Sequence, residues 1–197
     1  MRLRLALALC ALSSGAAAGQ EMTCVPTRDD TQRLSRLDVA WDEARKEVIE
    51  SGDGDAMRRL GPVADPRVNL TRPQPTPGRY QCRTIKLGAA SEGMLPYIAY
   101  GWFRCSVTLT PGGDLVLRKT NGSQRPVGLI CPVDTRKARF VGVLELGDEV
   151  RTPRYGADTD RDMIGEVRRV GDEAWRIAFP WPAHESKLDL LELRRTR

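Results

Sequence analysis

The most regular hydrophobic pattern in the chain lies over residues 29–50. Apolar residues recur there at intervals of three and four, which places them on one face of an α-helix. They are Leu34, Leu37, Trp41, Ala44 and Val48. Asp29 or Asp30 can cap the start of this helix, and the sequence Ser51-Gly52-Asp53-Gly54 is a typical end. The pattern therefore predicts one amphipathic helix, whose apolar face must be buried against another element.

The pattern changes after a short predicted helix over 55–60 and an irregular, proline-rich linker over 62–77. From Gly78 onward, short runs of β-branched and aromatic residues alternate with glycine, proline and aspartate turns, which is typical of strands in a hairpin meander. Eight runs are predicted to be strands: 79–87, 97–109, 115–120, 126–131, 139–146, 163–170, 175–179 and 188–193. A meander of this size closes most easily as a small barrel or a sandwich, because closure hides the edge strands.

The sequence thus predicts a mainly β (α+β) fold, with an N-terminal helix packed on a roughly eight-stranded antiparallel meander that closes as a small barrel or sandwich. Within the run 97–109, the face expected in the core carries Phe103, Cys105, Val107 and Leu109. The expected organisation is a signal peptide over 1–18, a helical segment and linker over 19–77, and an antiparallel β domain over 78–197.

The first residues have the three-part pattern of a cleavable secretory signal. Arg2 and Arg4 give a positive start, residues 5–12 are apolar, and Ala16-Ala17-Ala18 matches the A-x-A recognition site. We expect cleavage after Ala18, with Gly19 as the alternative site. The apolar run is far shorter than the ~20 residues that span a bilayer, so the pattern predicts an exported protein without a transmembrane segment.

Charge gives little indication of a polyanionic partner. Without the two arginines of the predicted signal, 29 basic residues face 26 acidic ones, a formal charge of about +3. The charges are mixed along the chain, whereas a nucleic-acid-binding protein usually shows a clustered basic excess. We therefore expect no nucleic-acid partner. About 179 residues remain after cleavage, which is enough for one domain with a sizeable core.

Four cysteines remain after the predicted cleavage, and an even number in an exported protein indicates disulfides. Four cysteines allow three pairings. Because Cys82 and Cys105 lie in consecutive predicted strands, we favour a bond between them, which leaves Cys24 to join the N-terminal segment to Cys131. A metal site is the alternative, but the chain has no C-x-x-C spacing and a single histidine.

Several longer motifs carry a resemblance to a known family. They are 80–88 (YQCRTIKLG), 96–105 (PYIAYGWFRC), 121–125 (NGSQR), 146–149 (LGDE), Tyr155-Gly156 with Arg161-Asp162, and 186–193 (SKLDLLEL). In this order they resemble a bacterial exported family of unknown function, DUF4893, from about Arg33 to the end of the chain. The resemblance implies export in a Gram-negative bacterium, hence a periplasmic location, and implies no activity, substrate or catalytic residue.

Candidate catalytic and metal-binding residues are few. His184 is the single histidine, and with carboxylates such as Glu185 or Asp158 it could act as the base of a hydrolase, although no G-x-S-x-G elbow is present. The spacing Asp158-x-Asp160-x-Asp162 opens like a calcium loop, but Met163 stands where such a loop needs glycine. A polar turn, with Arg161 paired to an aspartate, is the simpler interpretation. We therefore expect no metal and no cofactor.

A strand face with aromatic and basic residues is the most interesting candidate binding surface. It carries Tyr97, Tyr100, Trp102 and Arg104, with Arg83 expected on the neighbouring strand. The same residues could instead pack against the Trp41 face of the helix, an interpretation we favour because that face needs a cover. Arg125, in the turn 122–125, is a second candidate for ligand contact, but we favour a hairpin turn whose polar side chains satisfy backbone groups.

These features favour an exported periplasmic binding or interaction module over an enzyme. Its expected partner is a small molecule, a cell-envelope component or another exported protein, and its ligand would be small and apolar if the barrel is hollow. If side chains fill the barrel, a protein partner would bind at its rim. The alternative is a cell-envelope hydrolase that uses His184 with nearby carboxylates.

Overall fold

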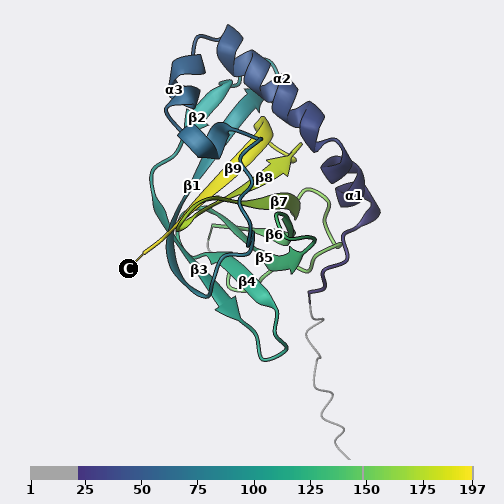
Figure 1. Cartoon of the computed structure of the whole chain (residues 1–197). Coiled ribbons are helices and arrows are strands. Elements are labelled where there is room, and N and C mark those ends of the chain that lie inside the picture. Colours follow the sequence, from purple (N-terminus) through teal and green to yellow (C-terminus); the bar gives the residue numbers. More distant parts are fainter. Residues whose placement is uncertain (1–21, 148, 197) are drawn as a thin grey trace, which may run out of the picture.

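The computed structural model describes residues 22–147 and 149–196, so the predicted signal peptide lies outside the described residues. Helices come first in the chain and strands follow (Figure 1). The helices are α1 (Arg28–Ser35), α2 (Leu37–Glu50), α3 (Gly54–Arg58) and the 3-10 turn η1 (Gly61–Ala64). The strands are β1 (Gly78–Ala89), β2 (Tyr97–Ala99), β3 (Phe103–Leu109), β4 (Leu115–Lys119), β5 (Gln124–Pro132), β6 (Ala138–Leu146), β7 (Asp162–Gly171), β8 (Ala174–Pro180) and β9 (Ser186–Arg195).

The strands form a closed antiparallel barrel, which confirms the predicted mainly β fold and selects the barrel over the sandwich. β1 pairs with β3, each strand from β3 to β8 pairs with the next along the chain, and β9 pairs with β1 to close the ring. The ninth strand, β2, pairs with β1 beyond the end of β3. Eight strands therefore build the barrel wall, and β2 extends one of its seams.

The predicted strand 97–109 is wrong in one respect, because it is broken into β2 and β3. Cys82 pairs with Phe103 and Ile85 pairs with Ala99. Two residues of β1 therefore face three residues, 100–102, on the other side. An extra residue on one strand interrupts the ladder and bends the strand, as in a β-bulge. Tyr100 and Trp102 consequently lie outside the regular strand.

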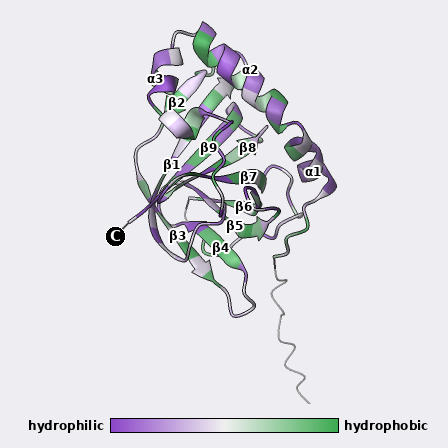
Figure 2. Ribbon diagram, viewed as in Figure 1, coloured by the Kyte–Doolittle hydropathy of each residue, from purple (hydrophilic) through white to green (hydrophobic). Residues whose placement is uncertain are grey.

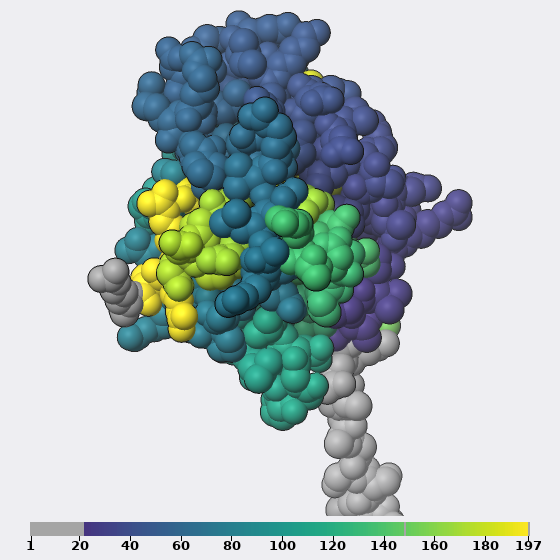
Figure 3. Space-filling model, in the orientation of Figure 1, coloured from purple at the N-terminus to yellow at the C-terminus, as the bar shows by residue number. Residues whose placement is uncertain are grey.

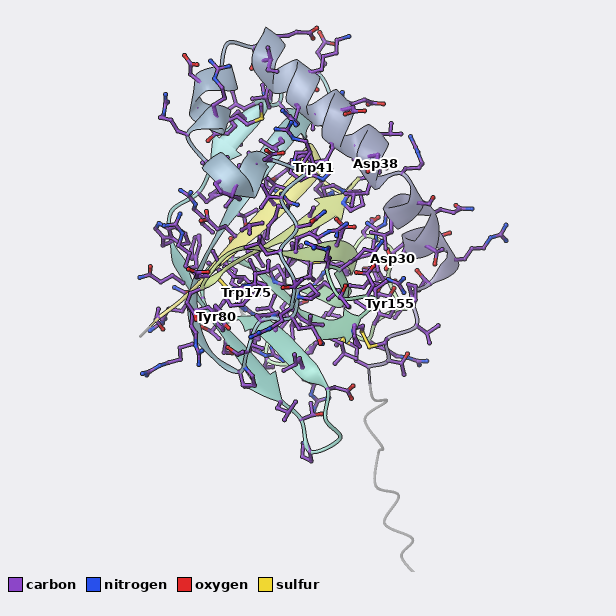
Figure 4. All side chains as sticks on the ribbon, in the orientation of Figure 1. Asp30, Asp38, Trp41, Tyr80, Tyr155 and Trp175 are labelled. Atoms are coloured by element: carbon purple, nitrogen blue, oxygen red, sulfur yellow. A yellow bond between two sulfur atoms is a disulfide. The ribbon has the colours of Figure 1, made fainter. Side chains whose placement is uncertain are left out.

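Large side chains fill most of the barrel. The inward-facing cluster includes Tyr80 and Trp175, whose rings meet edge to face at 5.8 Å, and both are labelled in Figure 4. Cys105 and Val107 are buried in this cluster and Phe103 packs against it, as predicted. Leu109, however, is 58% exposed, because it is the last residue of β3 before the turn at 111–113.

Two facing glycines allow the barrel to close around its aromatic residues. Gly128 of β5 and Gly142 of β6 are paired, and the Phe140 ring lies over both. A β-carbon at Gly142 would come within 2.5 Å of the Gly128 α-carbon and 2.9 Å of the Phe140 ring. Since real β-carbons avoid such contacts, these positions require glycine.

The helices cover one outer side of the barrel. The amphipathic α2 turns its apolar side inward (Figure 2), and Trp41, Ala44 and Val48 are buried there with Ile85 and Leu190 of the barrel wall. Gly88 permits this approach, since it has a positive φ of 68° and a β-carbon there would lie 2.9 Å from the Ala44 α-carbon. The helix face that needed a cover thus lies on β1 and β9.

The predicted single helix over 29–50 is in fact two helices, because Arg36 leaves helical geometry with φ −106° and ψ 19°. Its guanidinium stacks 4.8 Å from the centre of the Trp181 ring, and its carbonyl accepts a hydrogen bond from the Trp181 indole at 3.4 Å. A tertiary contact with the β8–β9 loop therefore accompanies the break. This contact also fixes α1 beside that loop.

The N-terminal segment and the proline-rich linker are both attached to the barrel. The structure contains the disulfides Cys24–Cys131 and Cys82–Cys105, the pairing favoured from the sequence. The linker crosses the outer surface (Figure 3), where Leu70 pairs with Arg169. The N-terminal segment is therefore held to the barrel by a disulfide, and the linker is held by a backbone contact.

Candidate functional site

One end of the barrel opens into a pocket, here called the mouth pocket. Strands β4, β6 and β8 end at this side, and β5, β7 and β9 begin there. Its apolar wall comes from Pro126, Leu144, Met163, Phe179, Pro180 and Leu191. The volume open to the centres of water-sized molecules is about 50 Å³. Since one water needs roughly 10–15 Å³, the pocket holds a few waters or a small chemical group.

A buried ion pair belongs to the same pocket. The Lys86 ammonium lies 3.0 Å from the Asp189 carboxylate and 3.2 Å from Glu185. Lys86 and Asp189 are 4% and 8% exposed, and the Ser186 hydroxyl donates a hydrogen bond to Asp189. Both paired residues line the mouth pocket. Charged groups in an otherwise apolar interior are typical of ligand sites, because they orient a ligand in a cavity that binds it through apolar contact.

Burial and charge act in opposite directions on this pair. Burial alone lowers the pKa of Lys86, but the neighbouring Asp189 and Glu185 outweigh it, so the pKa is raised. Burial raises the pKa of Asp189, with Lys86 and Ser186 opposing. The lysine therefore stays protonated at neutral pH.

A second lysine lies inside the barrel near this end. Lys119 is 4% exposed, donates a hydrogen bond to the Gln124 carbonyl at 2.8 Å, and lies 3.9 Å from the centre of the Phe103 ring. In residues 22–147 and 149–196, no carboxylate lies within 4 Å of its ammonium. Burial lowers the pKa of Lys119 to about 8, and the positive charges of Lys86 and Arg125 act in the same direction.

The β8–β9 loop at the rim is strained at both of its ends. Trp181 has a φ of 49° and Glu185 a φ of 72°. Positive φ values are rare for residues other than glycine, and they are genuine outliers for bulky ones. Such strain concentrates at binding sites and active sites. Pro182, Ala183 and His184, which lie between these two residues, all line the mouth pocket.

The residues suggested for a hydrolase are not brought together on the mouth pocket. His184 lines it, but the lining includes neither Glu185 nor Asp158; the carboxylates there are those of Asp160, Asp162 and Asp189. In the described part of the chain, no hydrogen bond joins its imidazole to a carboxylate, and Glu185 instead pairs with Lys86. Arg161 pairs with Glu149 at 2.6 Å, so the expected pairing with an aspartate is wrong. The described residues contain no group of three His, Cys, Asp or Glu side chains placed to hold a metal ion.

The predicted aromatic and basic surface is only partly continuous. Trp102 is 39% exposed, and its ring lies between the guanidiniums of Arg83, at 4.7 Å, and Arg194, at 5.1 Å. Both arginines pair with Glu192, which is fully buried beneath them. The structure thus adds Arg194 and Glu192 to the two predicted residues. None of these four residues lines the mouth pocket.

Tyr97, Tyr100 and Arg104 do not share one environment. Tyr97 packs against the helix-covered core, so the favoured packing interpretation holds for this residue. Tyr100 is 40% exposed, and Arg104 is exposed as well. The packing interpretation is wrong for these two residues, since neither belongs to the helix-covered core.

Arg125 holds loops together. Its guanidinium donates hydrogen bonds to the carbonyls of Gly122, Gly147 and Glu149, and it lies 3.5 Å from the Glu145 carboxylate. These contacts occupy its donors and connect the β4–β5 turn to the segment after β6. Arg125 therefore holds these two segments together.

The ion pair in the mouth pocket was not predicted from the sequence, although the alternation of side chains along two strands indicates it. Lys86 follows Tyr80, Cys82 and Thr84 at intervals of two, so it lies on the inward face of its strand. Asp189 likewise precedes the inward-facing Leu191 and Leu193. A charged residue at an inward position in each of two paired strands indicates a polar site within the barrel.

The fold and the site define a class of protein: a closed eight-stranded antiparallel barrel, covered on one side by helices, with a small amphipathic pocket at one end. The model of the family described as "Domain of unknown function (DUF4893)" matches residues 23–193, so the chain belongs to this family, as its motifs predicted. No curated protein and no solved structure matches the chain. Within residues 22–147 and 149–196, no helix is long and apolar enough to cross a bilayer.

Proposed function

We propose that this protein is an exported binding protein that takes a small molecule, or the end of a larger one, into the mouth pocket. The observation that carries the proposal is an apolar pocket that contains a buried ion pair, Lys86–Asp189, and is bordered by a strained loop. An apolar wall gives affinity, and a few fixed polar groups give orientation. The strained backbone of the β8–β9 loop supports the assignment of the mouth pocket as a binding site, since such strain concentrates at functional sites.

The dimensions of the barrel restrict what can enter. Tyr80, Phe140 and Trp175 are buried farther inside and fill the barrel beyond the pocket. A large apolar ligand of the kind that hollow barrels enclose has no room there. The ligand is therefore a small amphipathic molecule or a chain end. Export is supported by the signal-like N-terminus and by the two disulfides, which persist in oxidising compartments.

The first test is native mass spectrometry of the protein purified from periplasm, followed by denaturing mass analysis. We expect a mass excess that is released on denaturation as a small molecule. The Ala183→Trp variant places an indole at the pocket rim and should lose that excess. Leu109→Trp, at an exposed site on the opposite end of the barrel, is the matched control and should retain it.

Two outcomes contradict the proposal. One is a bare mass in the wild-type protein, combined with no thermal stabilisation by any member of a small-molecule library. The other is a bound molecule that survives Ala183→Trp unchanged, which would place its site elsewhere, the Trp102 cluster being the next candidate.

A further inference from the structure

A second hollow continues the mouth pocket along the start of α1. It is lined by Thr27, Asp29, Asp30, Arg33, Thr159, Asp160, Asp162, Trp181 and Ala183. Arg33, Asp160, Asp162 and Ala183 also line the mouth pocket, so the two hollows share a wall. The second hollow adds about 180 Å³ open to the centres of water-sized molecules. We call it the acidic groove.

The charges of the acidic groove do not balance. Asp30 is fully buried, pairs with Arg33 and accepts a 2.5 Å hydrogen bond from the Tyr155 hydroxyl, beside which it is labelled in Figure 4. In the part of the chain that the structure describes, no basic side chain lies within 4 Å of the carboxylates of Asp29, Asp160 and Asp162. Arg33 meets Asp162 only at its main-chain carbonyl, at 2.7 Å. Arg33, the one arginine that lines the groove, is therefore already paired with Asp30. The other three carboxylates have no ion-pair partner among the described residues.

Asp162 provides an independent observation at the wall shared by the two hollows. It is 4% exposed, and its Oδ1 accepts a hydrogen bond from the Gly156 amide at 2.8 Å. Its Oδ2 is buried and has no hydrogen-bond partner among the described residues. Burial raises the pKa of Asp162, and the negative charges of Asp30 and Asp158 add to this effect, with Arg33 opposing. Asp162 therefore contributes an uncompensated negative charge to the wall that the two hollows share.

We infer that the acidic groove and the mouth pocket together bind an organic cation, with an ammonium group between Asp160 and Asp162 and an apolar tail among Leu144, Met163 and Phe179. The exposed Asp160 makes the direct contact, and the buried Asp162 supplies the negative charge behind it. The ammonium is itself a hydrogen-bond donor, so it suits unpaired carboxylates. The inference rests on the proposed function, because it uses the same pocket for the tail.

The test compares three probes that share one tail: n-hexylammonium, n-hexanol and hexanoate. Each is titrated into the mature, disulfide-bonded protein at pH 7 and low salt, with affinity measured by calorimetry and by amide chemical shifts. We expect hexylammonium to bind at least tenfold more tightly than hexanol, and hexanoate to bind most weakly. The Ala183→Trp variant should abolish binding of all three probes.

The charge dependence is tested with Asp160→Asn and Asp162→Asn. Both should remove most of the preference for hexylammonium while leaving hexanol affinity unchanged. Asp162→Asn keeps the oxygen that accepts from Gly156 and loses only the unpartnered one. Asp172→Asn, which removes an equal charge at a fully exposed hairpin site, is the matched control and should bind like the wild type.

The outcomes separate the two proposals. Equal or reversed affinities, still blocked by Ala183→Trp, would overturn the cation inference and leave the pocket assignment standing. A preference for hexylammonium that survives both asparagine variants would also overturn it. Failure of all three probes to bind at millimolar concentration, together with a bare native mass, would contradict both.

Discussion

The buried Lys119 provides the sharpest test of the electrostatics inside the barrel. Its pKa is lowered to about 8 from an ordinary value of 10.5. One unit of pKa corresponds to about 1.4 kcal/mol, so burying this charge weakens the folded state by about 3 kcal/mol at neutral pH. Replacing it by methionine removes the charge and keeps an unbranched side chain of similar length.

The direction of the pH dependence follows from which state binds the proton. Below pH 8, both the folded and the unfolded state carry the charge, so the folded protein bears the full cost. Between pH 8 and 10.5, the unfolded state binds more protons, and the free energy of unfolding therefore rises with pH. Relative to Lys119→Met, the wild-type protein should gain about 2–3 kcal/mol between pH 7 and pH 10.

The assay is urea unfolding with the disulfides intact, followed by tryptophan fluorescence at pH 7, 8, 9 and 10. Lys119→Met also removes a hydrogen bond and an aromatic contact. Their contribution cancels when the change in the free energy of unfolding between two pH values is compared, instead of its value at one pH. Lys137→Met, at a more exposed lysine, is the control and should show no such divergence. Parallel pH profiles for the wild type and Lys119→Met would refute the reasoning.

Three further predictions concern stability. Gly142→Ala should lower the free energy of unfolding by roughly 1–3 kcal/mol through overpacking against Gly128 and the Phe140 ring; a neutral effect by urea unfolding would contradict the packing described. Removing Cys24–Cys131, which closes 107 residues, should cost about 5 kcal/mol, and removing Cys82–Cys105, which closes 23, about 3 kcal/mol; the reverse order in calorimetry would reject loop closure as the main contribution. Asp162→Asn should be more stable than the wild type at pH 7, because the raised pKa means that the ionised form weakens the fold, and this gain should vanish as the pH falls to about 3.8.

Local patterns were enough to predict an antiparallel meander that closes as a barrel or a sandwich, because alternating side chains and tight turns mark most of its strands. The choice of the barrel depends on the pairing of β1 with β9, which is a tertiary property. Two breaks left no sequence signal. The helix break at Arg36 keeps Leu34 and Leu37 three residues apart, so the helical spacing continues through it. The β-bulge at 100–102 depends on the register with β1, which is a tertiary property.

The candidate site was harder to predict, because its residues are far apart in the chain. Lys86 and Asp189 are separated by 103 positions and meet only through the pairing of β1 with β9. His184 was singled out as the lone histidine, and the structure does place it on the pocket. Trp102 and Arg83 were singled out from the faces of two neighbouring predicted strands, and they form a cluster with Arg194 elsewhere on the barrel.

The pairing of β1 with β9 has a consequence for the order of folding. The seam that closes the barrel joins Gly78–Ala89 to Ser186–Arg195, so the closing strand is the last of the described strands to be synthesised. Until it arrives, β1 and β8 each present an unpaired edge, and such edges favour association with other chains. Contacts between distant segments also slow folding, since a long loop must be ordered before they form. The barrel should therefore close late and slowly, and the unfinished sheet is the stage of folding most exposed to association with other chains.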